Sequence, residues 1–217
     1  MKLVRQYGLF LVGLFIASLG VAFSTKAGLG TSPVASVPYS VSLMSDLLSF
    51  GGWLNLLSVL QITVQVLLLG RRCKPVEIVI QTLLAFVYGY LTDFSCCLIA
   101  GLEVGSYPMQ LVFMLISCIV LAFGIWLQLK GGVAMLPGEA MNRAISTRTG
   151  RRYETVKVFF DVFYIVVSAV LGIVFLGGLK GVREGSIIAA VAIGNLIRFY
   201  NRCLNRLTSR REEKTHA

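Results

Sequence analysis

Long apolar segments separated by short polar stretches run through the whole chain. Most are close to the roughly 20 residues that an α-helix needs to cross the hydrocarbon core of a bilayer. We therefore predict an all-α membrane protein with six transmembrane helices. The predicted spans cover residues 8–27, 53–70, 77–100, 109–129, 154–178 and 184–201.

Part of the first predicted span, with the polar stretch that follows it, recurs later in the chain. Residues 16–42 align without a gap to residues 120–146. Each copy precedes two further predicted spans, and a unit of three spans forces the second copy to enter the membrane inverted. We therefore predict two inverted three-helix repeats, residues 1–104 and 105–201, and a basic tail, residues 202–217. The identical aligned pairs are Gly20 with Gly124, Lys26 with Lys130, Gly28 with Gly132, Pro33 with Pro137 and Ser42 with Ser146.

Both copies contain a glycine-rich break that ends in a proline. Because proline suits the first turn of a helix, we predict short half-helices over residues 33–46 and 137–147, with Pro38 kinking or shortening the first. Two interpretations stay open. The segments are either re-entrant half-helices, buried in protein or lining a wet cavity, or capped interfacial helices beside ordinary loops.

The first break carries groups that suit a binding site. Gly28 and Gly30 permit backbone conformations that other residues avoid. Thr31 and Ser32 offer hydroxyls that can cap the helix starting at Pro33. Free N–H groups at such a helix start favour an anionic or carbonyl-bearing ligand.

Composition and charge support the membrane class. Hydrophobic residues make up 56% of the chain and charged residues 14%, whereas a soluble domain carries about 25% charge. The net charge of +10 comes mainly from alternate connections, and this bias predicts that both termini are cytoplasmic. Basic residues scattered over several loops do not indicate a nucleic-acid partner. The basic stretches hold Lys2 and Arg5; Arg71, Arg72 and Lys74; Arg143, Arg148, Arg151 and Arg152; and Arg202, Arg206, Arg210, Arg211 and Lys214.

Asp161, in the sequence KVFFDVFYIVV, is the clearest ionisable residue in a predicted span. Burying such a residue without a partner costs at least ~2.5–3.5 kcal/mol, so we expect it to face a cavity or a partner. Gln61 is its inverted counterpart, and the alternative role is a structural hydrogen-bonded pair between helices. Glu139, in the first turn of the second half-helix, either complements the helix dipole or couples a proton or cation.

Four other charged residues lie near predicted helix ends. We expect the side chains of Asp93 and Arg198 to reach the membrane interface. Lys26 and Lys130 end the first span of each repeat, where they either interact with C-terminal carbonyls or contact substrate.

These features together predict a secondary transporter or facilitator of a small polar metabolite, anionic or zwitterionic. The alternative is a non-transporting membrane scaffold or accessory subunit that supports another membrane protein or a biosynthetic assembly. The predicted substrate-binding residues are Gly28, Gly30, Thr31, Ser32, Gly132, Pro137, Glu139, Gln61 and Asp161.

The sequence gives no indication of an enzyme. Its single histidine, His216, lies in the tail, and the glycine-rich breaks lack the Gly-Lys-Ser/Thr ending of a P-loop. We therefore expect no catalytic residues, no cofactor and no metal site, and transport that is passive or ion-coupled. The expected partners are the lipid bilayer and a small polar metabolite, and a homo-oligomer stays open.

The segment LGVAFSTKAGLGTSP, residues 19–33, with its altered second copy, resembles the YczE/YitT-like family of bacterial integral membrane proteins. The order of apolar segments fits this family over most of the chain. The resemblance implies a multi-pass protein of the bacterial cytoplasmic membrane with five or six spans. It implies no particular substrate or catalytic residue.

Overall fold

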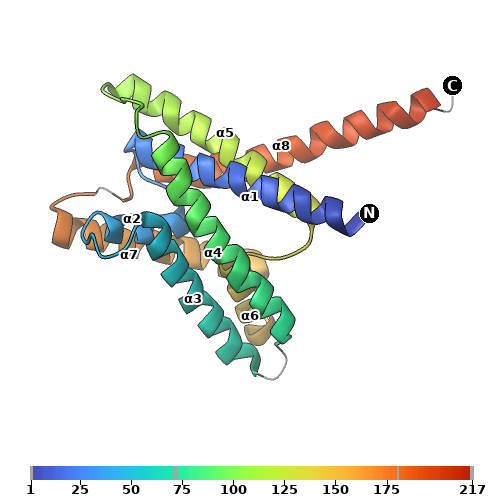
Figure 1. Ribbon diagram of the computed structural model, residues 1–217, viewed down its shortest axis with the longest axis horizontal. Helices are drawn as coiled ribbons and strands as arrows, with labels where there is room; N and C mark the ends of the chain where they lie inside the picture. The colour runs from blue at the N-terminus through green and yellow to red at the C-terminus, as the bar shows by residue number, and fades with distance from the viewer. Residues whose placement is uncertain (1, 71–72, 180, 216–217) are drawn as a thin grey trace.

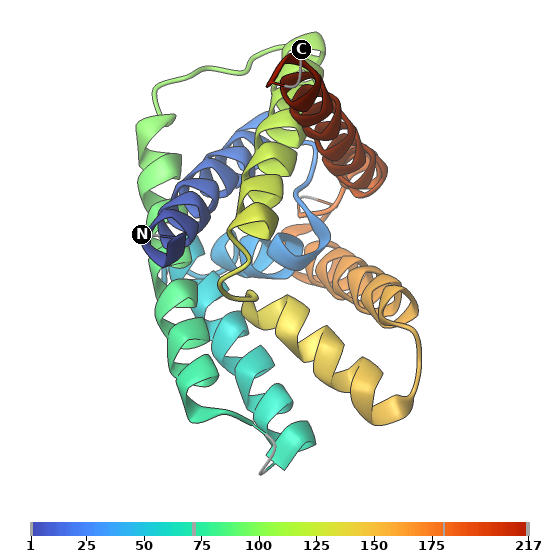
Figure 2. The same cartoon turned by 90° about the vertical axis from the view of Figure 1, so that its right-hand side faces the viewer.

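The computed structural model describes the backbone of residues 2–70, 73–179 and 181–215, and within these ranges it consists of helices and their connections (Figures 1 and 2). Arg71, Arg72, Lys180 and His216 lie outside the described residues. The helices are α1 (Lys2–Ala27), α2 (Pro33–Ser42), α3 (Phe50–Leu69), α4 (Pro75–Leu98), α5 (Tyr107–Gly131), α6 (Pro137–Thr149), α7 (Tyr153–Leu176) and α8 (Glu184–Thr215).

Five helices are long and apolar enough to cross a membrane, namely α1, α3, α4, α5 and α7. They confirm the prediction of an all-α, multi-pass membrane protein. Helix α8 is not among them, because its apolar run from Ile187 is interrupted by Asn195 and followed closely by Arg198. It also continues to Thr215 without a break, where the sequence predicted a separate tail from residue 202.

Successive long helices run in alternate directions between two ends of the molecule (Figure 1). The end where α1 begins, called the N-terminal end below, also holds the connection from α3 to α4 and the end of α5. The opposite end holds the ends of α1 and α4, where Lys26 Nζ donates to the carbonyl of Ala100 at 2.7 Å. The Lys26 ammonium thus binds a main-chain carbonyl just after α4, whereas the predicted carbonyl partners were those that end its own helix.

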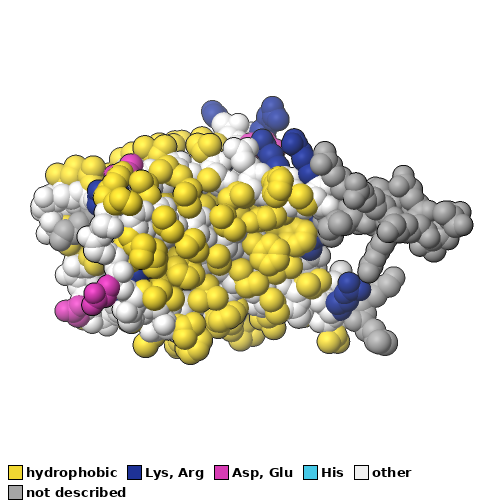
Figure 3. Space-filling view, turned by 90° about the horizontal axis from the view of Figure 1, so that it is seen from above, with side chains coloured by type: hydrophobic (Ala, Val, Ile, Leu, Met, Phe, Trp, Pro, Cys, Tyr) yellow, Lys and Arg dark blue, Asp and Glu magenta, His cyan; other side chains and the backbone are white. Residues whose placement is uncertain are grey.

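The surface between the two ends is apolar. Figure 3 shows hydrophobic side chains over most of one face, with Lys and Arg side chains gathered toward the right-hand end. Helix α7 contributes a long exposed row that includes Phe159, Phe163 and Val170. A surface of this kind suits contact with lipid acyl chains, which need no polar partner.

Helices α1 and α5 pack along each other at the centre of the structure (Figure 2). A Cβ atom at Gly20 would lie 2.6 Å from the Leu121 nitrogen, and one at Gly124 would overlap the backbone of Ala17. Ser117 Oγ also donates to the Gly20 carbonyl at 2.8 Å. The aligned pair Gly20 and Gly124 therefore lies at this crossing, where small residues let two membrane helices approach closely.

The two breaks have the predicted backbone geometry. Gly28, Gly30 and Gly132 have φ angles of 67°, 94° and 61°, which glycine adopts without the steric cost paid by other residues. Helices α2 and α6 begin at Pro33 and Pro137, as expected.

The details of α2 differ from the sequence predictions. The helix ends at Ser42, four residues earlier than expected, and it passes through Pro38 without a break. Ser32 occupies the N-cap position but makes no side-chain capping hydrogen bond, and Thr31 Oγ1 donates weakly to the Ser32 carbonyl at 3.4 Å. The predicted capping by these hydroxyls was therefore wrong.

Asp93 binds the start of α3. Its carboxylate accepts hydrogen bonds from Ser49 Oγ at 2.5 Å and from the Gly51 nitrogen at 2.7 Å. Asp93 lies near the end of α4, as predicted, and its carboxylate binds the start of the neighbouring helix α3. The loss of a helix-capping group costs about 0.5–2 kcal/mol.

We expect Asp93→Ala to lower the melting temperature of the purified protein in detergent by several degrees, because two donors at the start of α3 lose their acceptor. Asp46→Ala, the same change in the exposed connection before α3, serves as the control. Equal melting temperatures for both variants would show that the capping bonds contribute nothing to stability.

Candidate functional site

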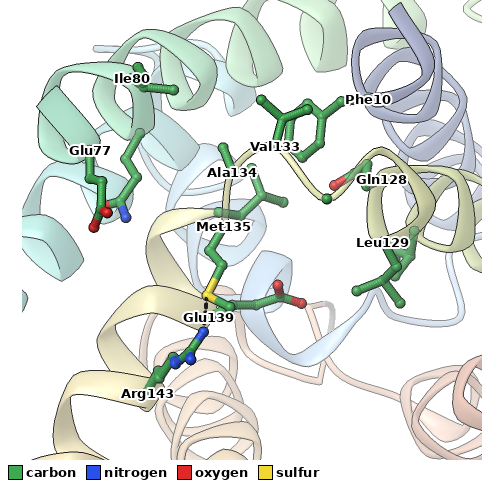
Figure 4. Close-up of a pocket in the computed structure, with 14 residues that line it drawn as sticks. Phe10, Glu77, Ile80, Gln128, Leu129, Val133, Ala134, Met135, Glu139 and Arg143 are labelled. Atoms are coloured by element: carbon green, nitrogen blue, oxygen red, sulfur yellow. Dashed lines mark hydrogen bonds between the residues drawn. The ribbon is translucent and has the colours of Figure 1, made fainter. Parts of the chain in front are cut away.

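A cavity of about 400 Å³ lies beside the second break, toward the N-terminal end (Figure 4). Its walls come from α1, α4, α5, the extended segment before α6, and the first two turns of α6. The lining residues are Phe10, Glu77, Ile80, Gln81, Ile125, Gln128, Leu129, Gly132, Val133, Ala134, Met135, Leu136, Glu139 and Arg143.

The second break shapes one wall of this cavity. Gly132, in the left-handed conformation, ends α5 and turns the chain into the extended segment that leads to the buried Pro137. Helix α6 then places Glu139 and Arg143, four residues apart, on one face. The glycine and the proline thus determine where these two charged side chains lie.

Two amide side chains form the opposite walls. Gln81 from α4 is only 6% exposed, and its Oε1 atom has no hydrogen-bond partner. Gln128 from α5 is 8% exposed and donates through Nε2 to the Gly13 carbonyl at 3.2 Å. Leaving a buried acceptor unpaired costs about 1–3 kcal/mol, so the buried Gln81 carbonyl oxygen is an acceptor without a donor in this conformation.

Charged groups of both signs line the cavity. Arg143 is exposed, and its Nη1 lies 3.6 Å from the sulfur of Met135. Figure 4 shows the Glu139 carboxylate turned away from Arg143, toward the side formed by Gln128 and Leu129. Burial raises the pKa of Glu139, and the nearby Lys157 ammonium opposes this effect.

Glu77 adds a second carboxylate to the lining of the cavity. It is exposed and forms an ion pair with Lys74, with 3.2 Å between Nζ and Oε1. Because the pair is solvated, it contributes little to stability. Its carboxylate remains available to a cationic group that enters the cavity.

Of the nine predicted binding residues, Gly132 and Glu139 line this cavity. The first break lies elsewhere, packed against the segment before α8. Thr31 is fully buried, and its nitrogen donates to the Gly181 carbonyl at 3.3 Å. Gly30 forms an isolated antiparallel bridge with Val182. Gly28, through its carbonyl, and Ser32, at the start of α2, belong to the same region.

Gln61 and Pro137 lie where α3, α6 and α7 meet. Gln61 is buried and donates through Nε2 to the Tyr164 hydroxyl at 2.9 Å. The start of α6 packs on it, since a Cβ atom at Gly138 would lie 3.3 Å from Gln61 Nε2. Gln61 therefore positions α6 and does not itself line the cavity.

Asp161 does not line the cavity either. Its Oδ2 lies 3.7 Å from Lys157 Nζ, one helical turn away, and its side chain is 27% exposed. The hydrogen-bond partner of Gln61 is Tyr164, three residues beyond Asp161, which the sequence analysis did not single out. The sequence signal for this contact was a tyrosine within an apolar span, because a buried tyrosine hydroxyl normally needs a hydrogen-bond partner.

Gln81, Gln128, Glu77 and Arg143 also line the cavity without having been predicted as binding residues. The two glutamines were visible as amides within the predicted third and fourth spans. The arrangement can bind a small molecule through amide oxygens, carboxylates and a guanidinium. In the described part of the chain, no group of three or more His, Cys, Asp or Glu side chains is arranged to hold a metal ion.

Comparison with family models matches residues 4–202 to a family of unknown function (DUF6198). The chain belongs to this family. The DUF6198 match includes both breaks, the cavity and the start of α8, and it ends at Arg202, where the sequence predicted the basic tail to begin. Searches of curated proteins and of solved structures gave no match. The DUF6198 assignment is consistent with a membrane protein and does not bear the YczE/YitT name expected from the sequence.

Proposed function

We propose that the protein is a secondary transporter or facilitator of a small polar metabolite, and that the cavity beside Gly132 holds this metabolite. The observation that carries the proposal is the unpaired Oε1 atom of Gln81, nearly buried in the wall of a cavity of about 400 Å³. Ligand pockets of several hundred Å³ with a few convergent polar groups are typical of small-molecule sites.

The packing of helices supports two inverted repeats. If α1, α2, α3 and α4 correspond to α5, α6, α7 and α8, the contact of α1 with α4 corresponds to that of α5 with α8. The contact of α2 with α7 likewise corresponds to that of α6 with α3, and the contact of α2 with α3 to that of α6 with α7. Among the described residues, the α3–α4 pair and the small α4–α6 contact lack equally extensive counterparts. We propose α8 as the sixth span, with repeats of residues 1–104 and 105–201.

The two short helices fit the re-entrant interpretation. Ala35 in α2 packs with Ala17 and Leu121 from the middle of α1 and α5. The start of α6 packs on Gln61 in the middle of α3. Each short helix thus begins deep in the helical bundle, and discontinuous helices of this kind form the substrate sites of many inverted-repeat transporters.

The charges of the cavity favour a zwitterionic substrate over a purely anionic one. Arg143 can bind an anionic group, while Glu139 and the Gln81 oxygen can accept hydrogen bonds from an ammonium group. Glu139 is also better placed than Asp161 to couple a proton, because it lines the cavity whereas Asp161 pairs with Lys157. We place the protein in the bacterial cytoplasmic membrane, with the basic N-terminal end facing the cytoplasm.

A thermal-shift experiment on purified protein tests the proposal. A panel of small zwitterions and anions should contain a compound that raises the melting temperature with concentration, since a ligand at 100 times its Kd stabilises by about 2.7 kcal/mol. Gln81→Leu should weaken that compound's binding about tenfold or more. Gln110→Leu, in α5 and away from the cavity, is the matched control.

The alternative is a non-transporting scaffold or accessory subunit, which predicts a different outcome. A scaffold needs no polar group in the cavity wall, so replacing the unpaired Gln81 amide by an apolar side chain in Gln81→Leu would raise the melting temperature without ligand. No compound in the panel would stabilise the wild type. That pair of results would reject the transport proposal.

A further inference from the structure

The second cavity expected from an inverted repeat is closed in this structure. Residues 89–91 (GYL) of α4 match residues 194–196 (GNL) of α8, and this pairing places Ser186 of α8 in correspondence with Gln81 of α4. Around Gln81 the second break stands away from α4 and leaves the cavity. Around Ser186 the first break lies directly on the start of α8.

Backbone contacts hold this region closed. The Gly185 nitrogen donates to the Leu29 carbonyl at 2.9 Å, and the Thr31 nitrogen donates to the Gly181 carbonyl at 3.3 Å. Gly30 pairs with Val182, and a Cβ atom at Gly30 would overlap Ser186 Oγ. The absence of a side chain at Gly30 thus lets the first break contact the start of α8. At the corresponding place beside Gln81, the cavity separates the second break from α4.

Ser186 resembles Gln81 in a second respect. It is fully buried, and its Oγ atom has no hydrogen-bond partner. A surface hollow of about 390 Å³ lies beside the contact between the first break and the segment before α8, and it is lined in part by Gly28, Tyr39 and Arg183. Arg183 Nη1 donates to the Gly28 carbonyl at 3.1 Å across the edge of this hollow.

We infer that the contact between residues 28–31 and 181–186 is the closed gate at the opposite end of the path that begins in the Gln81 cavity. The inference rests on the proposed transport function. In the present conformation the site is open toward the N-terminal end. In the alternate conformation residues 28–31 leave the start of α8, while the second break closes onto the start of α4. The unpaired Gln81 and Ser186 groups then serve in turn as polar contacts on one path.

Thiol accessibility in proteoliposomes tests this alternation. The five native cysteines are replaced by alanine, and Gln81→Cys or Ser186→Cys is added to the full chain. A membrane-impermeant maleimide should label position 81 from the N-terminal side quickly and position 186 from the opposite side slowly. Gly185→Ala, whose Cβ would lie 2.6 Å from the Leu29 carbonyl oxygen, should wedge the gate open.

The expected result with Gly185→Ala is about tenfold faster labelling at position 186 and correspondingly slower labelling at position 81. Gly194→Ala, in the same helix with open space around its Cβ, should change neither rate. If Gly185→Ala fails to fold, Arg183→Ala takes its place in the experiment. Arg183→Ala removes the hydrogen bond to the Gly28 carbonyl and should change both labelling rates in the same directions.

Two results would overturn the inference. One is faster labelling at position 186 with no decrease at position 81, because this would be a local opening unconnected to the cavity. The other is unchanged labelling at both positions in folded Gly185→Ala and Arg183→Ala. If a ligand still stabilises the protein in the thermal-shift experiment, the proposed function would remain supported and only the gate would be rejected. Reciprocal labelling without any stabilising compound would leave the gate standing and count against the proposed substrate class.

Discussion

Gly124→Val should prevent recovery of folded protein from the membrane. A Cβ atom at this position would overlap the Ala17 nitrogen and lie 2.7 Å from the Gly13 carbonyl oxygen. Both neighbours are backbone atoms of α1, which cannot move aside as a flexible side chain does. Overpacking a core costs about 1–3 kcal/mol even where side chains can adjust, and we expect a larger loss here.

Gly8→Val provides the matched control for this prediction. Gly8 lies in the same helix as Gly13, but its Cβ position has open space around it. The measurement is the fraction of monodisperse protein after detergent extraction, followed by the melting temperature of what remains. A Gly124→Val protein that melts within a few degrees of the Gly8→Val protein would contradict the close α1–α5 packing.

Glu139→Gln should make the protein more stable than the wild type as the pH rises. Burial raises the pKa of Glu139 above its ordinary value of 4.5 in the folded state. Between the unfolded and folded pKa values, the folded protein binds more protons than the unfolded chain, so the stability of the wild type falls as the pH increases. Glutamine does not titrate and shows no such fall.

The two proteins should therefore melt most nearly alike at about pH 4 and differ increasingly toward about pH 8. Each unit by which the pKa is raised corresponds to about 1.4 kcal/mol. Glu103→Gln, at an exposed site near the opposite end, controls for the general loss of a negative charge. A constant difference between Glu139→Gln and wild type at every pH would show that the pKa of Glu139 is the same in the folded and unfolded protein. It would also remove Glu139 as a candidate for proton coupling.

The membrane class and the two breaks could be predicted because their signals are local. A long, predominantly apolar run determines each of the five long apolar helices, and a glycine with positive φ before a proline determines each break. Helix α8 was harder to predict, because Asn195 and Arg198 reduce its apolar character within a single turn of each other. The helix also continues to Thr215, and the sequence around residue 202 contains no local signal that shows whether the helix ends or continues there.

The cavity could be predicted only in part. Glu139 and Gly132 belong to the repeated break and were named for that reason. The positions of Gln81 and Gln128 depend on how α4 and α5 pack around the second break, which sequence periodicity does not specify. Asp161 was assigned to the site because it interrupts an apolar span, yet Lys157 at four residues' distance already offers the local partner that such spacing favours.

The bonds between α1 and α5 restrict how the molecule can move. Ser117 and Gln128 of α5 donate to the carbonyls of Gly20 and Gly13, so the two helices are joined at separate levels as well as packed backbone to backbone. Sliding one helix along the other would break both bonds together. We therefore expect α1 and α5 to move as one rigid unit. Any rearrangement would then take place in the helices and connections packed around this pair.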